Sequence, residues 1–160
     1  MIDARAVLKD VAERLRAAIP EVEVALTPER PQTWRLNHPR AALLVAYGGS
    51  RYGDARDADL VVQERVLRVH VYIVARALHD AYGAVPLVDA AADALLGLRA
   101  TNTGRFRLVS DRFVSEEAGI WTYELVFEAE TLAIEDRDLS AVPRLARVTA
   151  DYGFEQETLP

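Results

Sequence analysis

Two segments of this chain alternate apolar and polar residues with a period of two, and this alternation constrains the fold more than any other feature. Over residues 67–75 every odd position is apolar, while Arg68 and His70 stand at even positions. Over residues 121–129 the odd positions are again apolar and most of the even ones are polar. Successive side chains of a β-strand point to opposite faces of its sheet. Each segment therefore predicts a long strand with one buried face and one polar face.

The other elements follow from periodicity and from turn residues. A helix is expected after Asp3, which can cap it, up to Pro20, and a second helix over 85–99 with Pro86 at its first position. Strands are expected over 21–26, 41–47, 105–114 and 120–130, the last two forming a hairpin around the five-residue connection Ser-Glu-Glu-Ala-Gly. The apolar run 41–47 is typical of a strand covered on both faces.

This order of elements predicts an α+β fold. We expect a single domain over 1–160, with a mostly antiparallel sheet and two helices packed on one face. Its core should span about 3–132, with 133–160 as a C-terminal arm. The proline-rich segment 27–40 and the glycine-containing segment 48–59 are predicted to be exposed loops.

Composition restricts the function further. The 160 residues contain no Cys, which excludes disulfide frameworks, zinc-thiolate sites and thiol catalysis. The net charge of −6 argues against a nucleic-acid-binding protein, because neutralising phosphates requires clustered basic residues. The N-terminal residues lack the apolar region of a secretory signal, and no window is apolar enough to span a membrane. Synthesis in the cytoplasm is therefore expected.

No motif in the chain predicts a catalytic, cofactor or metal site. Gly48 and Gly49 follow a predicted strand, but the Lys and Ser/Thr of a phosphate-binding loop are missing. Three groups were considered as metal ligands or catalytic residues, and none has a suitable spacing: the aspartates Asp54, Asp57 and Asp59, the histidines His38, His70 and His79, and the serines Ser50, Ser110, Ser115 and Ser140. We expect a protein that is not an enzyme and needs no cofactor.

The polar faces of the long strands leave two interpretations open. Glu124, Glu128 and Glu130 form an acidic stripe. Glu64, Arg68 and Arg76 form a mixed stripe on the other long strand and the residues next to it. These side chains either form a solvated sheet face or meet another subunit, where an acidic stripe could also repel a passing polyanion.

Taken together, several segments resemble the Mu-like phage tail terminator proteins, also called tail-completion proteins. The resemblance covers residues 41–130 and rests on four stretches: Leu44–Gly53, Val62–Arg65 leading into Val69–Leu78, Gly83–Asp89, and Arg112–Phe127. It implies an α+β subunit that closes into a homo-oligomeric ring, expected to be a hexamer, on the head-proximal end of a contractile tail. Such a ring stops growth of the tube and sheath and forms a platform for a head-connector or cap protein.

The resemblance also implies the partners, and the predicted 48–59 loop and the polar strand face offer candidate contact residues. The partners would be copies of the chain itself, the tail tube protein and neighbouring sheath or connector proteins, with DNA only as passing cargo and no membrane. Candidate residues for the subunit and tube interface are Arg51, Tyr52, Arg56, Glu64, Arg68 and Arg76, since Arg and Tyr are favoured in interface cores. Two alternatives remain: a head-completion or baseplate adaptor of the same particle, or a small-molecule-binding α+β domain with a polar site inside an apolar pocket.

Overall fold

The computed structural model describes residues 2–56 and 59–136. Within these ranges the chain forms two α-helices, one short 3-10 helix and five strands, in the order α1 (Ala4–Ala18), β1 (Glu23–Leu26), η1 (Pro31–Thr33), β2 (Ala41–Tyr52), β3 (Val62–Ala75), α2 (Ala84–Leu95), β4 (Arg107–Glu117) and β5 (Ile120–Ile134). None of the helices in these ranges is long and apolar enough to cross a membrane.

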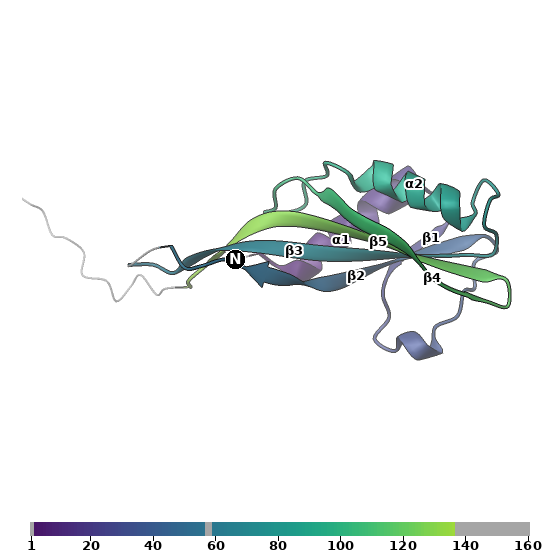
Figure 1. Cartoon of the computed structure of the whole chain (residues 1–160), viewed down its shortest axis with the longest axis horizontal. Helices are drawn as coiled ribbons and strands as arrows, with labels where there is room; N and C mark the ends of the chain where they lie inside the picture. Colours follow the sequence, from purple (N-terminus) through teal and green to yellow (C-terminus); the bar gives the residue numbers. More distant parts are fainter. Residues whose placement is uncertain (1, 57–58, 137–160) are drawn as a thin grey trace, which may run out of the picture.

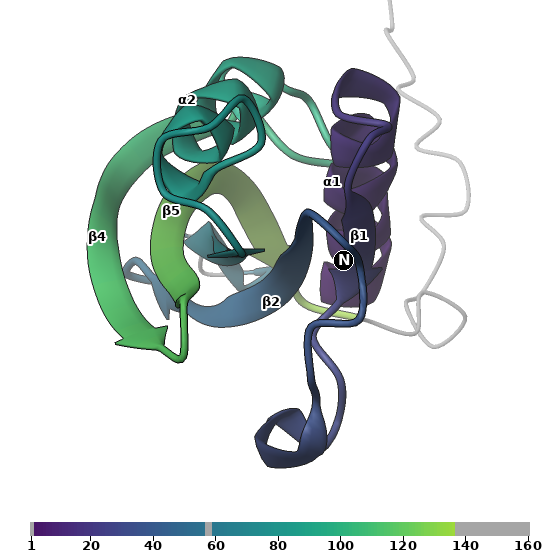
Figure 2. The ribbon, with the colours of Figure 1, turned by 90° about the vertical axis from the view of Figure 1, so that its right-hand side faces the viewer.

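The strands form one sheet in the order β1-β2-β3-β5-β4. The short pairing of β1 with β2 is parallel, and the other three pairings are antiparallel. Both helices lie on the same face of this curved sheet, and the η1 segment projects from the opposite side (Figure 1, Figure 2). The predicted α+β architecture is therefore confirmed.

The core lies between the helices and the odd-numbered positions of β3 and β5. Helix α1 begins where the Asp3 carboxylate accepts a hydrogen bond from the Arg5 backbone N–H (2.9 Å), which satisfies one of the free N–H groups of the first turn. Its buried face carries Val7, Val11 and Leu15, which pack in one cluster with apolar residues of the sheet and of α2. The alternation seen in the sequence thus decides which sheet face the helices cover.

The strand β2 is covered on both faces, as the apolar run predicted. Ala41, Leu43 and Val45 belong to the helix-side core. On the other face, Ala42 packs with Val74 of β3 and with Leu36 and Trp34 from the segment before β2. The proline-rich connection 27–40 is therefore a small second layer at one end of the sheet.

The prediction that a loop begins at residue 48 was wrong, because β2 continues to Tyr52. Its pairing with β3 shifts register between Tyr47 and Ser50, so Gly48 and Gly49 form a β-bulge. Gly49 has a φ of 95°, and a Cβ on Gly48 would overlap the His70 ring. The two glycines therefore allow β2 to continue past the His70 ring, at the point where the sequence predicted the end of the strand.

The β4–β5 hairpin is also tighter than predicted. Both strands extend into the expected five-residue connection, so only Ala118 and Gly119 link them. Their φ values are 51° and 81°, as in a type I′ turn, whose twist matches that of the paired strands. Alanine is unfavourable at this position because its Cβ crowds the backbone in the left-handed region.

Helix α2 is shorter than predicted. It ends at Leu95 because the chain then turns back, and the Gly97 backbone N–H donates to the Phe106 carbonyl (2.8 Å). It begins at Ala84, so Pro86 occupies the third helical position. Proline is tolerated there because the first N–H groups of a helix have no intrahelical partner.

Ala118→Asn should stabilise the protein by about 0.5–1 kcal/mol, because asparagine tolerates the left-handed conformation that alanine adopts only under strain. Chemical denaturation of both proteins measures the change. The matched variant Gly119→Ala, which places a Cβ at the next left-handed position, should lower the free energy of unfolding instead. Equal stabilities for all three proteins would contradict this account of the turn.

Candidate interaction surface

The sheet face opposite the helices, here called the outer face, carries two buried carboxylates. Glu124 and Glu128 of β5 are only 6% and 5% exposed. The interpretation of this stripe as fully solvated is therefore wrong for these two residues, whereas the Glu130 side chain is 69% exposed. A buried carboxylate requires charged or hydrogen-bonding partners, and neighbouring strands supply them.

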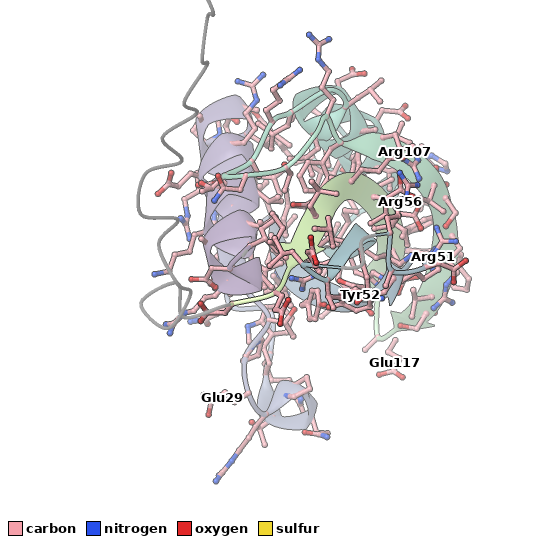
Figure 3. The ribbon with its side chains drawn as sticks, turned by 90° about the vertical axis from the view of Figure 1, so that its left-hand side faces the viewer. Glu29, Arg51, Tyr52, Arg56, Arg107 and Glu117 are labelled. Atoms are coloured by element: carbon pink, nitrogen blue, oxygen red, sulfur yellow. The ribbon has the colours of Figure 1, made fainter. Side chains whose placement is uncertain are left out.

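Three arginines from three strands surround Glu128. Its carboxylate accepts hydrogen bonds from Arg68 of β3 (2.5 Å), Arg107 of β4 (3.0 Å) and Arg51 of β2 (3.3 Å). Arg68 and Arg107 are its direct partners in the two pairings of β5. Figure 3 shows Arg51 and Arg107 on the same side of the molecule. One carboxylate therefore ties together four adjacent strands.

Glu124 is the centre of a second cluster, toward the hairpin end of β5. It accepts a hydrogen bond from Arg112 of β4 (3.0 Å) and contacts Nδ1 of His70 (3.2 Å) and the hydroxyl of Tyr72. The other ring nitrogen of His70 is buried without a partner, against Gly48. The glycine of the bulge thus makes room for the histidine that faces Glu124.

Opposing effects set the pKa values of these groups. Hydrogen bonding from Arg68 lowers the pKa of Glu128, burial opposes it, and the charges of Arg51, Arg68 and Arg107 add to the lowering. Burial raises the pKa of Glu124, but hydrogen bonds and nearby positive charge outweigh it, so this pKa also lies below its ordinary value. Burial and the adjacent Glu124 raise the pKa of Tyr72. Both carboxylates are therefore ionised at neutral pH.

A third polar cluster lies on the helix side of the sheet, where β2 and β3 extend together. Arg65, 7% exposed, donates to the hydroxyls of Ser50 (2.9 Å) and Tyr47 (3.1 Å). Its guanidinium also lies 5.7 Å from the centre of the Tyr52 ring. Burial raises the pKa of Tyr47, but the hydrogen bonds with Ser50 and Arg65 and the charge of Arg65 lower it overall. No local pattern in the sequence predicts this cluster, because it depends on the bulge.

The six predicted interface residues fall into three places. Arg51 and Arg68 meet at Glu128. Arg56 pairs with Glu64 (3.0 Å), close to where Tyr52 ends β2. Arg76 lies after the other end of β3 and donates to the carbonyls of Leu36 (2.8 Å) and His38 (3.0 Å). Five of the six therefore lie toward one end of the sheet, and Arg76 holds the 27–40 segment at the other.

A hollow of about 730 Å³ lies on the outer face between the 27–40 segment and the β4–β5 hairpin. Its lining is mainly apolar and includes Trp34, Leu44 and Val74, and neither His70 nor His79 contributes to it. Within residues 2–56 and 59–136, no three His, Cys, Asp or Glu side chains are grouped so that they could hold a metal ion. Of the loop aspartates considered above, Asp57 lies outside the described residues.

A family model places the chain among known proteins. The model described as "Gp37 protein" matches residues 11–156, which is most of the sequence. The chain belongs to the Gp37 protein family. No curated protein matches the sequence.

The fold of this Gp37-family chain is also found in a solved virion structure. A chain in "Virion of native gene transfer agent (GTA) particle" superposes with a TM-score of 0.57 and is 20% identical in sequence. The match covers 81% of the present chain and 97% of the virion chain. The two chains therefore share one fold over nearly the whole of the virion subunit.

The buried carboxylates predict how stability depends on pH. A carboxylate whose pKa is lower in the folded state stabilises the fold at pH values above its unfolded pKa, about 4.3, and this contribution is lost as the pH falls through the folded value. The free energy of unfolding should therefore fall below about pH 4. Glu128→Gln should lower the free energy of unfolding at pH 7 by about 1–3 kcal/mol. It should also make the stability depend less on pH below about pH 4.

The control is Glu130→Gln, which removes an exposed carboxylate from the same strand face. It should change stability little, because exposed ion pairs contribute about 0–1 kcal/mol. Urea denaturation between pH 3 and pH 7 distinguishes the two variants. Identical pH profiles would show that Glu128 does not hold the strands together as described.

Proposed function

We propose that this chain is a structural subunit of a phage-like particle, and that it acts as a tail terminator. In this role a ring of subunits, expected to be a hexamer, caps the head-proximal end of a contractile tail tube and stops growth of the tube and sheath. The observation that carries the proposal is the fold shared with nearly the whole of a gene transfer agent virion chain. The resemblance of residues 41–130 to Mu-like tail terminators supplies the finer role.

The organisation of the charged side chains supports a structural role. Among the described residues, the ion-pair partners of the two buried carboxylates all lie in the sheet, where these charges link neighbouring strands. The hollow on the outer face is lined mainly by apolar residues. Its titratable lining residues are Arg35, Tyr72 and Glu117, and its lining includes neither Glu128 nor the three arginines around it. These features favour a surface that binds other proteins over an active site.

Contacts with neighbouring subunits and with the tube would use the end of the sheet where Arg51, Tyr52, Arg56, Glu64 and Arg68 gather. Arg51 and Arg56 each expose about 70% of the side chain while pairing with a glutamate. An exposed guanidinium that already lies in a fixed orientation loses little conformational freedom on binding. Arg76 would act at the opposite end, where it fixes the segment that carries η1.

The net charge fits a channel for DNA, if the particle has a head that is filled with it. A net charge of −6 on each subunit would repel the phosphate backbone and prevent adhesion during passage. The particle tail would be the site of action, after synthesis in the bacterial cytoplasm, with no membrane involved.

An adaptor role in the same particle, at the head or the baseplate, is the alternative. The fold alone serves both roles, since function resides in surfaces and not in the architecture. Tail length distinguishes them, because only a terminator limits growth of the tube.

Deleting the gene should yield particles whose tails are overlong, variable in length or open at the upper end. Electron microscopy of particles made with and without the gene measures this directly, and re-expression of the intact chain should restore uniform length. Tails of normal length and normal ends would contradict termination. Normal tails without attached heads would favour the adaptor.

A further inference from the structure

The strand β4 forms a long open edge of the sheet. It has 11 residues, and within the described ranges its only strand partner is β5. Four large apolar side chains on it are exposed by 38–51%: Leu108, Val109, Phe113 and Val114. Charged residues and two register shifts against β5 also lie along this strand, and both features limit unspecific edge pairing. The four exposed apolar side chains nevertheless leave a surface that a specific partner strand can cover.

A second open edge lies on the opposite side of the same sheet. β1 pairs with Ala42–Val45, so within residues 2–56 and 59–136 the later part of β2, residues 46–52, has a strand partner on one side only. This segment also exposes two large side chains, Tyr47 by 44% and Tyr52 by 54%. Figure 2 shows β4 and β1 at opposite edges of the curved sheet.

We propose that β4 of one copy of the chain pairs with residues 46–52 of a second copy, so that the sheet continues from subunit to subunit. This inference rests on the proposed ring and names its interface. The pairings β2–β3, β3–β5 and β5–β4 are all antiparallel, so β4 runs opposite to β2. Copies related by rotation about an axis along the strands would therefore meet in the antiparallel orientation.

The spacing of the exposed side chains fits this pairing. Tyr47 and Tyr52 are five residues apart across the Gly48–Gly49 bulge. Val109 and Val114, which lie at the two register shifts between β4 and β5, are also five residues apart. A centred antiparallel register places Tyr52 opposite Val109 and Tyr47 opposite Val114. Aromatic and β-branched residues are a favourable cross-strand combination. Because the contact joins two different surfaces, its repetition closes a ring where the rotation permits.

Engineered disulfides test the contact, and the absence of native cysteine makes the test clean. The chain with both Tyr52→Cys and Val109→Cys, oxidised as purified full-length protein and within particles, should give a ladder of cross-linked species on non-reducing gels. Val109→Cys alone should give no cross-link, because one β4 does not meet another. A dimer from the single variant, or no ladder from the double variant in either preparation, would overturn the pairing.

A matched pair of lysine substitutions gives an independent readout. Val109→Lys on β4 and Val85→Lys on α2 replace valines of similar exposure, 43% and 39%. Light scattering should show that Val109→Lys abolishes oligomerisation and that Val85→Lys does not. Circular dichroism should show that both variants are folded. An oligomer that withstands Val109→Lys would refute this interface without refuting the proposed function. Tails of normal length after gene deletion would contradict the proposed function without testing this interface.

Discussion

The antiparallel pairing of β3 with β5 is the contact on which the rest of the structure depends. Every residue from Val62 to Ala75 has a partner in β5, so these two strands are the centre of the sheet. Their odd-numbered apolar residues pack against the helices in the core, and their even-numbered residues form the outer face. A slip of one residue would move each set to the wrong side. The fold therefore requires a mechanism that fixes this register.

The two buried glutamates provide that mechanism on the outer face. Glu128 lies directly opposite Arg68 and Arg107, and Glu124 lies directly opposite Arg112. A register shift would leave a carboxylate buried without its partner, which is costly. The apolar side of the sheet favours burial in general, whereas these charges favour one alignment. The same residues thus fix the strands and leave partly exposed guanidinium groups at the surface.

Much of this arrangement was predictable from the sequence, since strand alternation and helical periodicity are local patterns. The Asp3 cap, the buried β2 run and the two apolar faces are examples. What was missed depends on contacts between distant segments. Gly48 and Gly49 are typical of a loop, and only the pairing with β3 makes them a bulge. Glu128 is typical of a solvated stripe until its three arginines, from β2, β3 and β4, are placed around it. The sequence does contain an arginine for each glutamate. These pairs can be recognised only when the register between the strands is known.

In the part of the chain that the structure describes, both edges of the sheet are open and its centre is firmly fixed. Such a sheet is suited to repeated assembly, which links the fold to the particle role proposed for this Gp37-family chain. A cryo-electron-microscopy reconstruction of the purified particle tests that role most directly. The account predicts a closed ring of this fold at the upper end of the tail, with density continuous between neighbouring sheets. A particle without this chain, or one that holds it as isolated copies elsewhere, would contradict the account.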